Sequence, residues 1–252
     1  MTTVGVESRG PVAHLVLNRP PVNVLNISML KELAEAVRRE GAREGVRVLV
    51  VRGEGKAFSA GVDVGEHLSE TIDAMLAAFR EAASAILAAP VPIVAQVHGA
   101  CLGGGMELAM AADLAYAADT ATFGQPEIKL GVFPPFAAAA YPAWFGRGRA
   151  AELVLLGETI TAHEALARGL LAGVVPASDL AAKVEAVCAQ LAALSPSSLR
   201  IARDALRIGS ARGLDALDAI ESLYLRDLMA TEDATEGLRA FLEKRPPKWR
   251  GA

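Results

Sequence analysis

The chain has 252 residues, of which 52% are hydrophobic and 21% are charged, and its formal net charge is −4. This composition is typical of a globular protein with a large core; it excludes a disordered chain, and the net negative charge argues against general nucleic-acid binding. The sequence has no apolar run of membrane-spanning length and no signal-peptide pattern at its start, so we expect no membrane association and a cytoplasmic protein.

Strands and helices alternate over the first half of the chain. Short runs rich in β-branched residues predict strands over residues 4–7, 12–17, 46–51, 91–97, 114–117 and 121–123. Apolar residues at helical spacing predict helices over residues 29–42 and 69–89, and Asn26 or Ser28 can cap the first of them. This alternation predicts an α/β core.

The second half of the chain is mostly helical after Gly146. Helices are predicted over residues 149–156, 163–168, 180–194, 197–208, 214–229 and 231–244. We therefore divide the chain into an α/β core, residues 1–195, and a C-terminal helical region, residues 196–252. The second part is expected to pack on the core or on a neighbouring subunit.

Residues 90–113, PVPIVAQVHGACLGGGMELAMAAD, combine a buried strand, a glycine-rich turn and a helix. Gly103, Gly104 and Gly105 have no Cβ, so backbone N–H groups at this helix N-terminus can approach a ligand that develops negative charge. Glu107 lies on an otherwise apolar segment, which indicates a buried carboxyl with a chemical purpose. The alternatives are an acid favoured by the helix dipole and glycines needed only for close packing. The glycines match neither the dinucleotide-binding nor the Walker A pattern.

Three further motifs accompany this stretch: KAFSAGVDV at residues 56–64, FGQPEIKLG at 123–131 and AFLEKRPPKW at 240–249. Together with HGACLGGGMELAMAAD at residues 98–113, they resemble the enoyl-CoA hydratase/isomerase (crotonase) superfamily over essentially the whole chain. The resemblance implies an α/β fold, a crotonase-like spiral of ββα units with a C-terminal helical trimerisation region. It also implies an acyl-CoA thioester as substrate and a homotrimer or homohexamer.

A thioester becomes enolate-like when a nucleophile adds at C3 or a proton leaves C2, so the site must offer hydrogen-bond donors to its oxygen. By the resemblance, these donors are the backbone N–H groups of Val62, in the SAGV turn, and of Gly104. The alternative is that the turn is only a strand exit. Ser59 is not a hydrolase nucleophile, because its surroundings lack the first glycine of GxSxG.

Hydration also needs a base that activates water and an acid that protonates C2, and two carboxyl groups in different surroundings can share this work. By the resemblance, Glu107 and Glu127 occupy the two catalytic glutamate positions of the superfamily. The alternative for Glu127 is an exposed loop acid. Having both acids favours hydration over isomerisation and other reactions of the superfamily. We assign Glu107 as the principal base and Glu127 as the proton donor to C2.

Binding of CoA needs cations for its phosphates and a slot for adenine. By the resemblance, Lys56 lies near the phosphates, its loop lines the adenine slot, and two C-terminal residues complete the site, often from an adjacent subunit. The residues predicted to contact CoA are Lys56, Ala57, Ala60, Val62, Phe241 and Lys244. The alternative is that the lysines are solvated surface charges. Because CoA is part of the substrate, we expect no separate cofactor.

No metal site is predicted. None of the four histidines lies at metal-ligand spacing from another ligand type, and Cys101 and Cys188 form no CxxC pair. His98, at the end of the central strand, is interpreted as a hydrogen-bonded structural residue. Asp63 is interpreted as ordering its turn through side-chain to backbone hydrogen bonds.

The segment after Gly131 departs from the superfamily pattern. Many members have a glycine-rich run there, whereas this chain has VFPPFAAAA at residues 132–140. Two prolines and a Phe stiffen the loop and add bulk beside Glu127. This version resembles the cyclohexa-1,5-diene-1-carbonyl-CoA hydratases, and a flat ring would fit beside Phe133 or Phe136.

The leading hypothesis is therefore an acyl-CoA hydratase that adds water reversibly to a 2-enoyl-CoA or to a conjugated, cyclic dienoyl-CoA. An alternative is isomerisation or another crotonase reaction on acyl-CoA. An alternative of a different class is a non-catalytic relative that binds CoA esters or RNA. Both acids count against this last alternative, and the net charge counts against its RNA version.

Overall fold

The computed structural model describes residues 2–68 and 70–251, with the side chains of all of these except Leu214. The fold is α/β, and its main element is a six-stranded sheet in the order β1-β2-β3-β4-β6-β9. The six strands are β1 (Val4–Arg9), β2 (Val12–Leu17), β3 (Val48–Gly53), β4 (Ile93–Val97), β6 (Leu114–Ala118) and β9 (Gly173–Val175). The β1–β2 pair is an antiparallel hairpin, and every other neighbouring pair is parallel.

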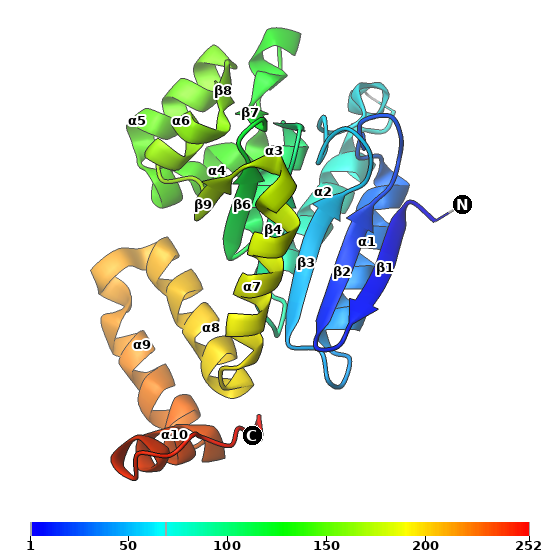
Figure 1. The fold of residues 1–252 in the computed structure, drawn as a ribbon. Helices are drawn as coiled ribbons and strands as arrows, with labels where there is room; N and C mark the ends of the chain where they lie inside the picture. The colour runs from blue at the N-terminus through cyan, green and yellow to red at the C-terminus, as the bar shows by residue number, and fades with distance from the viewer. Residues whose placement is uncertain (1, 69, 252) are drawn as a thin grey trace.

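Helices cover both faces of this sheet (Figure 1). On one face, α1 (Ile27–Gly41) and α2 (Ile72–Leu87) pack on a core that includes Leu49 and Val51 of β3. On the other face, α7 (Leu180–Ala192) packs on Val48 and Val50 of the same strand. Because alternate side chains of β3 enter two different cores, the strand is apolar at nearly every position.

A second, three-stranded sheet lies beside the first and positions the glycine-rich turn. It consists of β5 (Ala100–Leu102), β7 (Thr122–Gly124) and β8 (Thr159–Thr161), in that order. The short strand β5 continues the chain from β4 directly into α3 (Gly104–Ala111). The 3₁₀ turn η1 (Val64–His67) follows the β3 exit, and η2 (Pro126–Leu130) follows β7.

The rest of the chain is helical. The remaining α-helices are α4 (Pro135–Phe145), α5 (Arg147–Ala151), α6 (Ala162–Ala167), α8 (Pro196–Arg212), α9 (Leu217–Leu223) and α10 (Glu232–Leu242). Single π-helical turns, η3 (Glu152–Leu156) and η6 (Tyr224–Leu228), extend α5 and α9, and the 3₁₀ turns η4 (Ala177–Asp179) and η5 (Gly213–Ala216) precede α7 and α9. None of the helices in the described part of the chain is long and apolar enough to cross a bilayer.

The predicted strands and helices are confirmed in type, with ends that differ by a few residues. Ser69, the predicted start of the second helix, lies outside the described residues, and that helix begins at Ile72. Three short strands, β5, β8 and β9, were not predicted, because three-residue strands carry too little pattern. The expectation of a stiff loop over residues 132–140 is wrong from Pro135 onward, where α4 begins. A proline fits the first helical position because no N–H is needed there.

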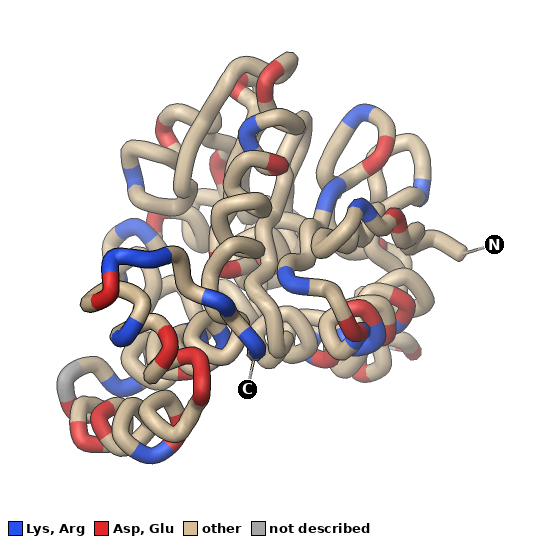
Figure 2. The backbone as a smooth tube through the Cα atoms, turned by 60° about the horizontal axis from the view of Figure 1, so that its bottom comes forward, with Lys and Arg blue, Asp and Glu red and all other residues tan. Residues whose placement is uncertain are grey.

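The C-terminal helices extend away from the sheet, as Figure 1 shows in yellow to red. Basic and acidic residues lie side by side along these helices and the final tail (Figure 2). Arg245 forms a two-pronged ion pair with Glu236, at 2.6 and 2.8 Å, and Arg250 pairs with Glu232 at 3.0 Å. The basic residues of this tail are thus partly neutralised by acids of α10.

Arg203 of α8 joins the helical region to the sheet. Its Nε lies 2.7 and 2.8 Å from the carboxylate oxygens of Asp113, and its guanidinium also donates to the carbonyl oxygens of Ala89 and Ile86 at the end of α2. Asp113 in turn accepts the N–H of Ile93 at 2.7 Å. One side chain therefore connects α8 to the end of α2 and the start of β4.

We predict that Arg203→Met lowers the free energy of unfolding by about 2 kcal/mol, because it removes a largely buried guanidinium that pairs with Asp113 and donates to the carbonyl oxygens at the end of α2. Chemical denaturation at fixed protein concentration measures this. The control is Arg207→Met, whose ion pair with Asp204 is exposed and should contribute less than about 0.5 kcal/mol. Equal losses in the two variants would contradict the anchoring role of Arg203.

Candidate active site

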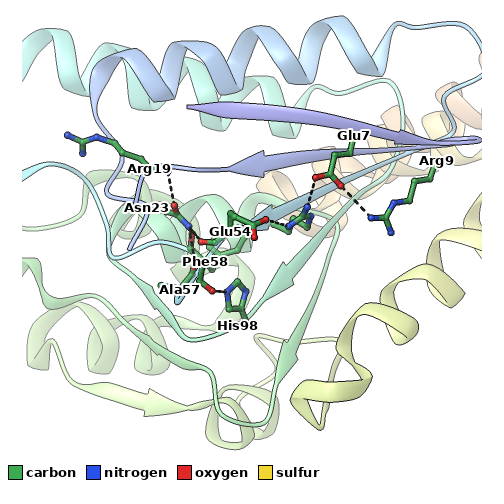
Figure 3. Close-up of polar contacts among 10 residues, drawn as sticks. Glu7, Arg9, Arg19, Asn23, Glu54, Ala57, Phe58 and His98 are labelled. Atoms are coloured by element: carbon green, nitrogen blue, oxygen red, sulfur yellow. Dashed lines mark hydrogen bonds and ion pairs between the residues drawn. The ribbon is translucent and has the colours of Figure 1, made fainter. Parts of the chain in front are cut away.

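The turn after β3 is held in place by a buried asparagine, Asn23 (Figure 3). Its Nδ2 donates to the carbonyl oxygens of Glu54 at 2.9 Å, Ala57 at 2.8 Å and Phe58 at 3.2 Å. Its Oδ1 accepts the N–H of Arg19 at 2.9 Å. Asn23 has a φ of +53°, a backbone conformation that asparagine tolerates better than most residues. This side chain therefore fixes the SAGV turn against the segment that precedes α1.

Backbone hydrogen bonds fix the same turn on both sides of Val62. Leu25 donates to the carbonyl oxygen of Gly61 at 2.8 Å and accepts the N–H of Asp63 at 2.9 Å. Leu102, just before the glycines, donates to the carbonyl oxygen of Ser59 at 3.0 Å. The turn is thereby attached both to the α1 side and to the strand that leads into α3.

The backbones of the turn and of the α3 N-terminus come into close contact. A Cβ on Gly104 would overlap the Val62 side chain and would lie 2.9 Å from the ring of Phe79. A Cβ on Gly61 would lie 3.2 Å from the carbonyl oxygen of Leu102. Among the described residues, neither Val62 nor Gly104 donates its backbone N–H to a protein acceptor. Two uncommitted N–H groups therefore lie on adjoining segments.

Glu107 lies on the first turn of α3 and is only 4% exposed. Its Oε1 accepts the N–H of Ala137, in the first turn of α4, at 2.7 Å. Burial raises the pKa of Glu107 to about 8; the Ala137 hydrogen bond opposes this rise, and the charge of Glu127 adds to it. The predicted buried carboxyl is confirmed, and near neutral pH it retains its proton.

Glu127 projects from η2 onto the first glycine of the triple. A Cβ on Gly103 would lie 2.5 Å from its Oε1, and Gly103 also has a φ of +51°, so this position requires glycine. Burial raises the pKa of Glu127, while its own backbone N–H and the charge of His67 act in the opposite direction. Glu127 is half-buried rather than the exposed acid of the alternative interpretation.

Gln125 and Tyr141 support Glu127 from inside the protein, and both are fully buried. When the Gln125 amide is oriented to satisfy both neighbours, its Nε2 donates to the Glu127 carboxylate at 3.1 and 3.3 Å and its Oε1 accepts from the Tyr141 hydroxyl at 2.8 Å. The reverse orientation presents Oε1 to Glu127. An amide can therefore hydrogen-bond Glu127 in either protonation state.

Both glutamates line one pocket of about 100 Å³. Val62, Gly103 and His67 share its wall. Its apolar lining comes from Met75, Leu76 and Phe79 of α2 and from Leu130, Val132, Phe133, Pro134 and Pro135. The structure thus brings together three of the four predicted catalytic residues, with Gly104 immediately behind Val62.

The predicted CoA-binding residues fall into two groups. Ala60 lines the pocket, and Lys56 and Ala57 precede it in the same turn. Phe241 and Lys244 lie at the end of α10, at the opposite end of the molecule from this turn (Figure 1). Phe241 is 82% exposed. One chain therefore does not unite the two groups, and a CoA site containing both remains a prediction that requires a neighbouring subunit.

The family model described as enoyl-CoA hydratase/isomerase matches residues 7–252. The chain belongs to this family. The resemblance drawn from the four sequence motifs is thereby confirmed.

Relatives within the enoyl-CoA hydratase/isomerase family are similar over almost their full length. The chain is 39% identical to the cyclohexa-1,5-dienecarbonyl-CoA hydratase of Thauera aromatica, covering 98% of this chain and 95% of that protein. It is 37% identical to a probable enoyl-CoA hydratase of Bacillus subtilis, covering 95% of each. The crystal structure of the enoyl-CoA hydratase from Bacillus anthracis matches with a TM-score of 0.92 and 32% identity, covering 99% of this chain and 100% of that one. The predicted crotonase-like fold is confirmed.

Asp63 and His98 have the supporting structural roles that the sequence predicts. Asp63 accepts the N–H of Gly65 at 3.1 Å and pairs with Arg19 at 3.2 Å, so it orders its turn. His98 lies 3.0 Å from the carbonyl oxygen of Gly55, which is the hydrogen-bonded structural role expected of it (Figure 3).

Sequence reasoning missed several residues of the site. Gln125 stands inside the FGQPEIKLG motif but has no predicted role, and Tyr141 lies just after the segment predicted as a loop, in the helix α4, which was not predicted from the sequence. Asn23 and His67 carry no local pattern that distinguishes them from other polar residues. A polar residue inside an otherwise diagnostic motif, such as Gln125, was the one usable signal.

We predict that Glu107→Gln stabilises the protein above pH 5. Because the folded-state pKa of Glu107 is raised from its ordinary value to about 8, the wild type loses stability as the pH rises from about 4.5 to 8. Gln keeps the shape and can still accept the Ala137 N–H. The expected gain at pH 8 is on the order of 4 kcal/mol, because the pKa rises from 4.5 to about 8 and each pKa unit corresponds to about 1.4 kcal/mol.

Denaturation at pH 5 and pH 8 measures this difference. The exposed Glu35→Gln on α1 serves as the control and should show no gain at either pH. A Glu107→Gln variant that is no more stable than the wild type at pH 8 would contradict the buried, protonated carboxyl.

Proposed function

We propose that the protein is a hydro-lyase that adds water reversibly to the C2=C3 double bond of a 2-enoyl-CoA or a conjugated dienoyl-CoA. The observation that carries the proposal is the convergence of Glu107 and Glu127 on one small pocket, beside the uncommitted N–H groups of Val62 and Gly104. The hydratase names of the family members described above support it.

In this mechanism the thioester oxygen binds between the N–H groups of Val62 and Gly104. One carboxylate removes a proton from water, the water oxygen forms a bond to C3, and the double-bond electrons move to give the enolate. The other carboxyl then delivers its proton to C2 as the carbonyl re-forms. Loss of one such N–H donor costs about 3 kcal/mol of transition-state stabilisation in comparable sites.

The chemistry requires the two glutamates to hold one proton between them. In the free site that proton resides on Glu107, because its pKa is about 8. The sequence-based assignment, with Glu107 as base and Glu127 as donor, therefore requires the proton to pass to Glu127 when substrate binds. If instead Glu127 is the base and Glu107 is the proton donor, no such transfer is needed. In either case the active state carries one proton.

For CoA itself, we propose that Lys56, Ala57 and Ala60 contact the nucleotide end beside the pocket. Phe241 and Lys244 would then come from a neighbouring subunit of a homotrimer or homohexamer, because α10 of the same chain lies at the far end of the molecule.

We predict that Glu107→Gln and Glu127→Gln each lower kcat for crotonyl-CoA hydration by at least about 100-fold, because each removes one proton transfer. Hydration is followed by the loss of enoyl thioester absorbance, with Glu35→Gln as the control. For the wild type, kcat/KM should fall above about pH 8 as the shared proton is lost. An isomerase would instead keep double-bond migration largely intact in one of the two variants.

The acyl group we propose is a cyclic conjugated dienoyl. The Thauera aromatica relative carries that specificity in its name, and the pocket is small and partly aromatic. Phe79 lines it and packs edge-on against Phe136, with ring centroids 6.0 Å apart. Phe133 also lines it and is 60% exposed, so its ring can cover a flat substrate at the pocket mouth.

We predict that cyclohexadienecarbonyl-CoA has a higher kcat/KM than crotonyl-CoA or longer 2-enoyl-CoA esters. Phe133→Ala should lower kcat/KM for the cyclic substrate about fivefold to tenfold, which corresponds to roughly 1 kcal/mol of lost ring contact. Crotonyl-CoA is the internal control, because it has no ring to cover. A clear preference for straight chains would remove the dienoyl assignment and leave the hydratase proposal intact.

A further inference from the structure

His67 is an ionisable residue of the pocket that the proposed mechanism does not use. It is the last residue of η1 and lines the same pocket as Glu107 and Glu127. No signal in the sequence distinguishes it. Among the described side chains it is the one histidine in the pocket wall.

The imidazole ring of His67 is held in a fixed orientation. Its Nδ1 lies 3.1 Å from the carbonyl oxygen of Asp63. A carbonyl oxygen only accepts hydrogen bonds, so Nδ1 carries a hydrogen, and Nε2 is the ring nitrogen that this contact leaves free. Asp63 is itself held by Arg19, at 3.2 Å, and by the N–H of Gly65, at 3.1 Å. The ring therefore rests on an ordered turn.

Of the charged groups near His67, Glu127 is the one that the charge of His67 influences most. Asp63 is already paired with Arg19, and Glu66 accepts the N–H of Ile27 at 2.7 Å. Among the pocket-lining residues, the other ionisable groups are Glu127 of η2 and Glu107 of α3. The fully buried Tyr141 hydroxyl of α4 does not line the pocket and contacts Gln125. Among the described residues no ion pair within 4 Å joins His67 to a carboxylate, so it acts through space.

We propose that His67 is a positioning residue that keeps Glu127 ionised. The proton of the glutamate pair then stays on Glu107. This inference rests on the proposed function. The two glutamates repel each other, and only one can be ionised at low cost. Burial alone raises the pKa of both. The charge of His67 lowers the pKa of Glu127, and the charge thus kept on Glu127 raises that of Glu107.

The test compares the pH dependence of kcat/KM in the wild type, His67→Gln and His67→Lys. Because the active state needs one ionised carboxylate, the acid limb follows protonation of Glu127. His67→Gln removes the cation and should move this limb to higher pH by roughly 0.5 to 1 unit. His67→Lys restores a cation and should return the limb toward its wild-type position. His163→Gln, on the exposed N-terminus of α6, is the control and should not move it.

A second measurement does not depend on turnover. Carboxyl carbons of ¹³C-labelled glutamate are titrated by NMR in the ligand-free protein, with Glu107→Gln and Glu127→Gln used for assignment. His67→Gln should move the Glu127 titration to higher pH, whereas a merely structural role would lower activity without moving it.

The outcomes separate the two proposals. A wild type that hydrates no acyl-CoA of the panel overturns the proposed function, and the NMR titration alone then decides whether His67 keeps Glu127 ionised. An active wild type whose acid limb and Glu127 titration are both unmoved by His67→Gln overturns the role of His67 and leaves the hydratase proposal standing.

Discussion

The site depends on the close approach of four neighbouring residues to three consecutive glycines. Gly103 faces the carboxyl of Glu127, Gly104 faces Val62 and Phe79, and a Cβ on Gly105 would lie 2.7 Å from the Cβ of Ser59. Each glycine therefore allows a different neighbouring group to approach the start of α3. One side chain at any of these positions would separate the SAGV turn or the second carboxyl from the start of α3, so the triple is a packing requirement as well as a source of N–H groups.

The same approach explains why a carboxyl can be buried at all. Glu107 lies behind the glycines, where water has little access, and its main compensation is the N–H of Ala137. That N–H is available because the first turn of a helix leaves its amides without intrahelical partners. The N-terminus of α4 thus takes part in the site, although its sequence, rich in proline and alanine, suggests only a stiff connection. Burial raises the proton affinity of Glu107, and this raised affinity is also what suits the carboxyl to proton transfer.

The limits of sequence-based prediction follow from how each feature is encoded. The SAGV turn, the glycine triple and both acids lie within short contiguous motifs, and the strands of the main sheet carry long apolar runs. Those features could be predicted. The contacts of Asn23 with the turn, of Tyr141 with Gln125 and of Ala137 with Glu107 join segments that are far apart in the chain. Local patterns do not encode such pairings, and the two prolines at the start of α4, Pro134 and Pro135, obscured the helix that supplies two of them.

Unequal burial of the two acids follows directly from the elements that carry them. Glu107 projects from a helix inside the fold, whereas Glu127 projects from a 3₁₀ turn at the pocket wall, within reach of the charge of His67. Two chemically identical groups thereby acquire different surroundings: burial is the largest cause of the raised pKa of Glu107, whereas the charge of His67 opposes the rise in the pKa of Glu127. Glu127 lies against Gly103, Glu107 follows the same glycines on α3, and both line one pocket, so the packing that brings the N–H groups together also brings the acids together. In the proposed mechanism, oxygen binding and proton transfer therefore both depend on this one backbone contact.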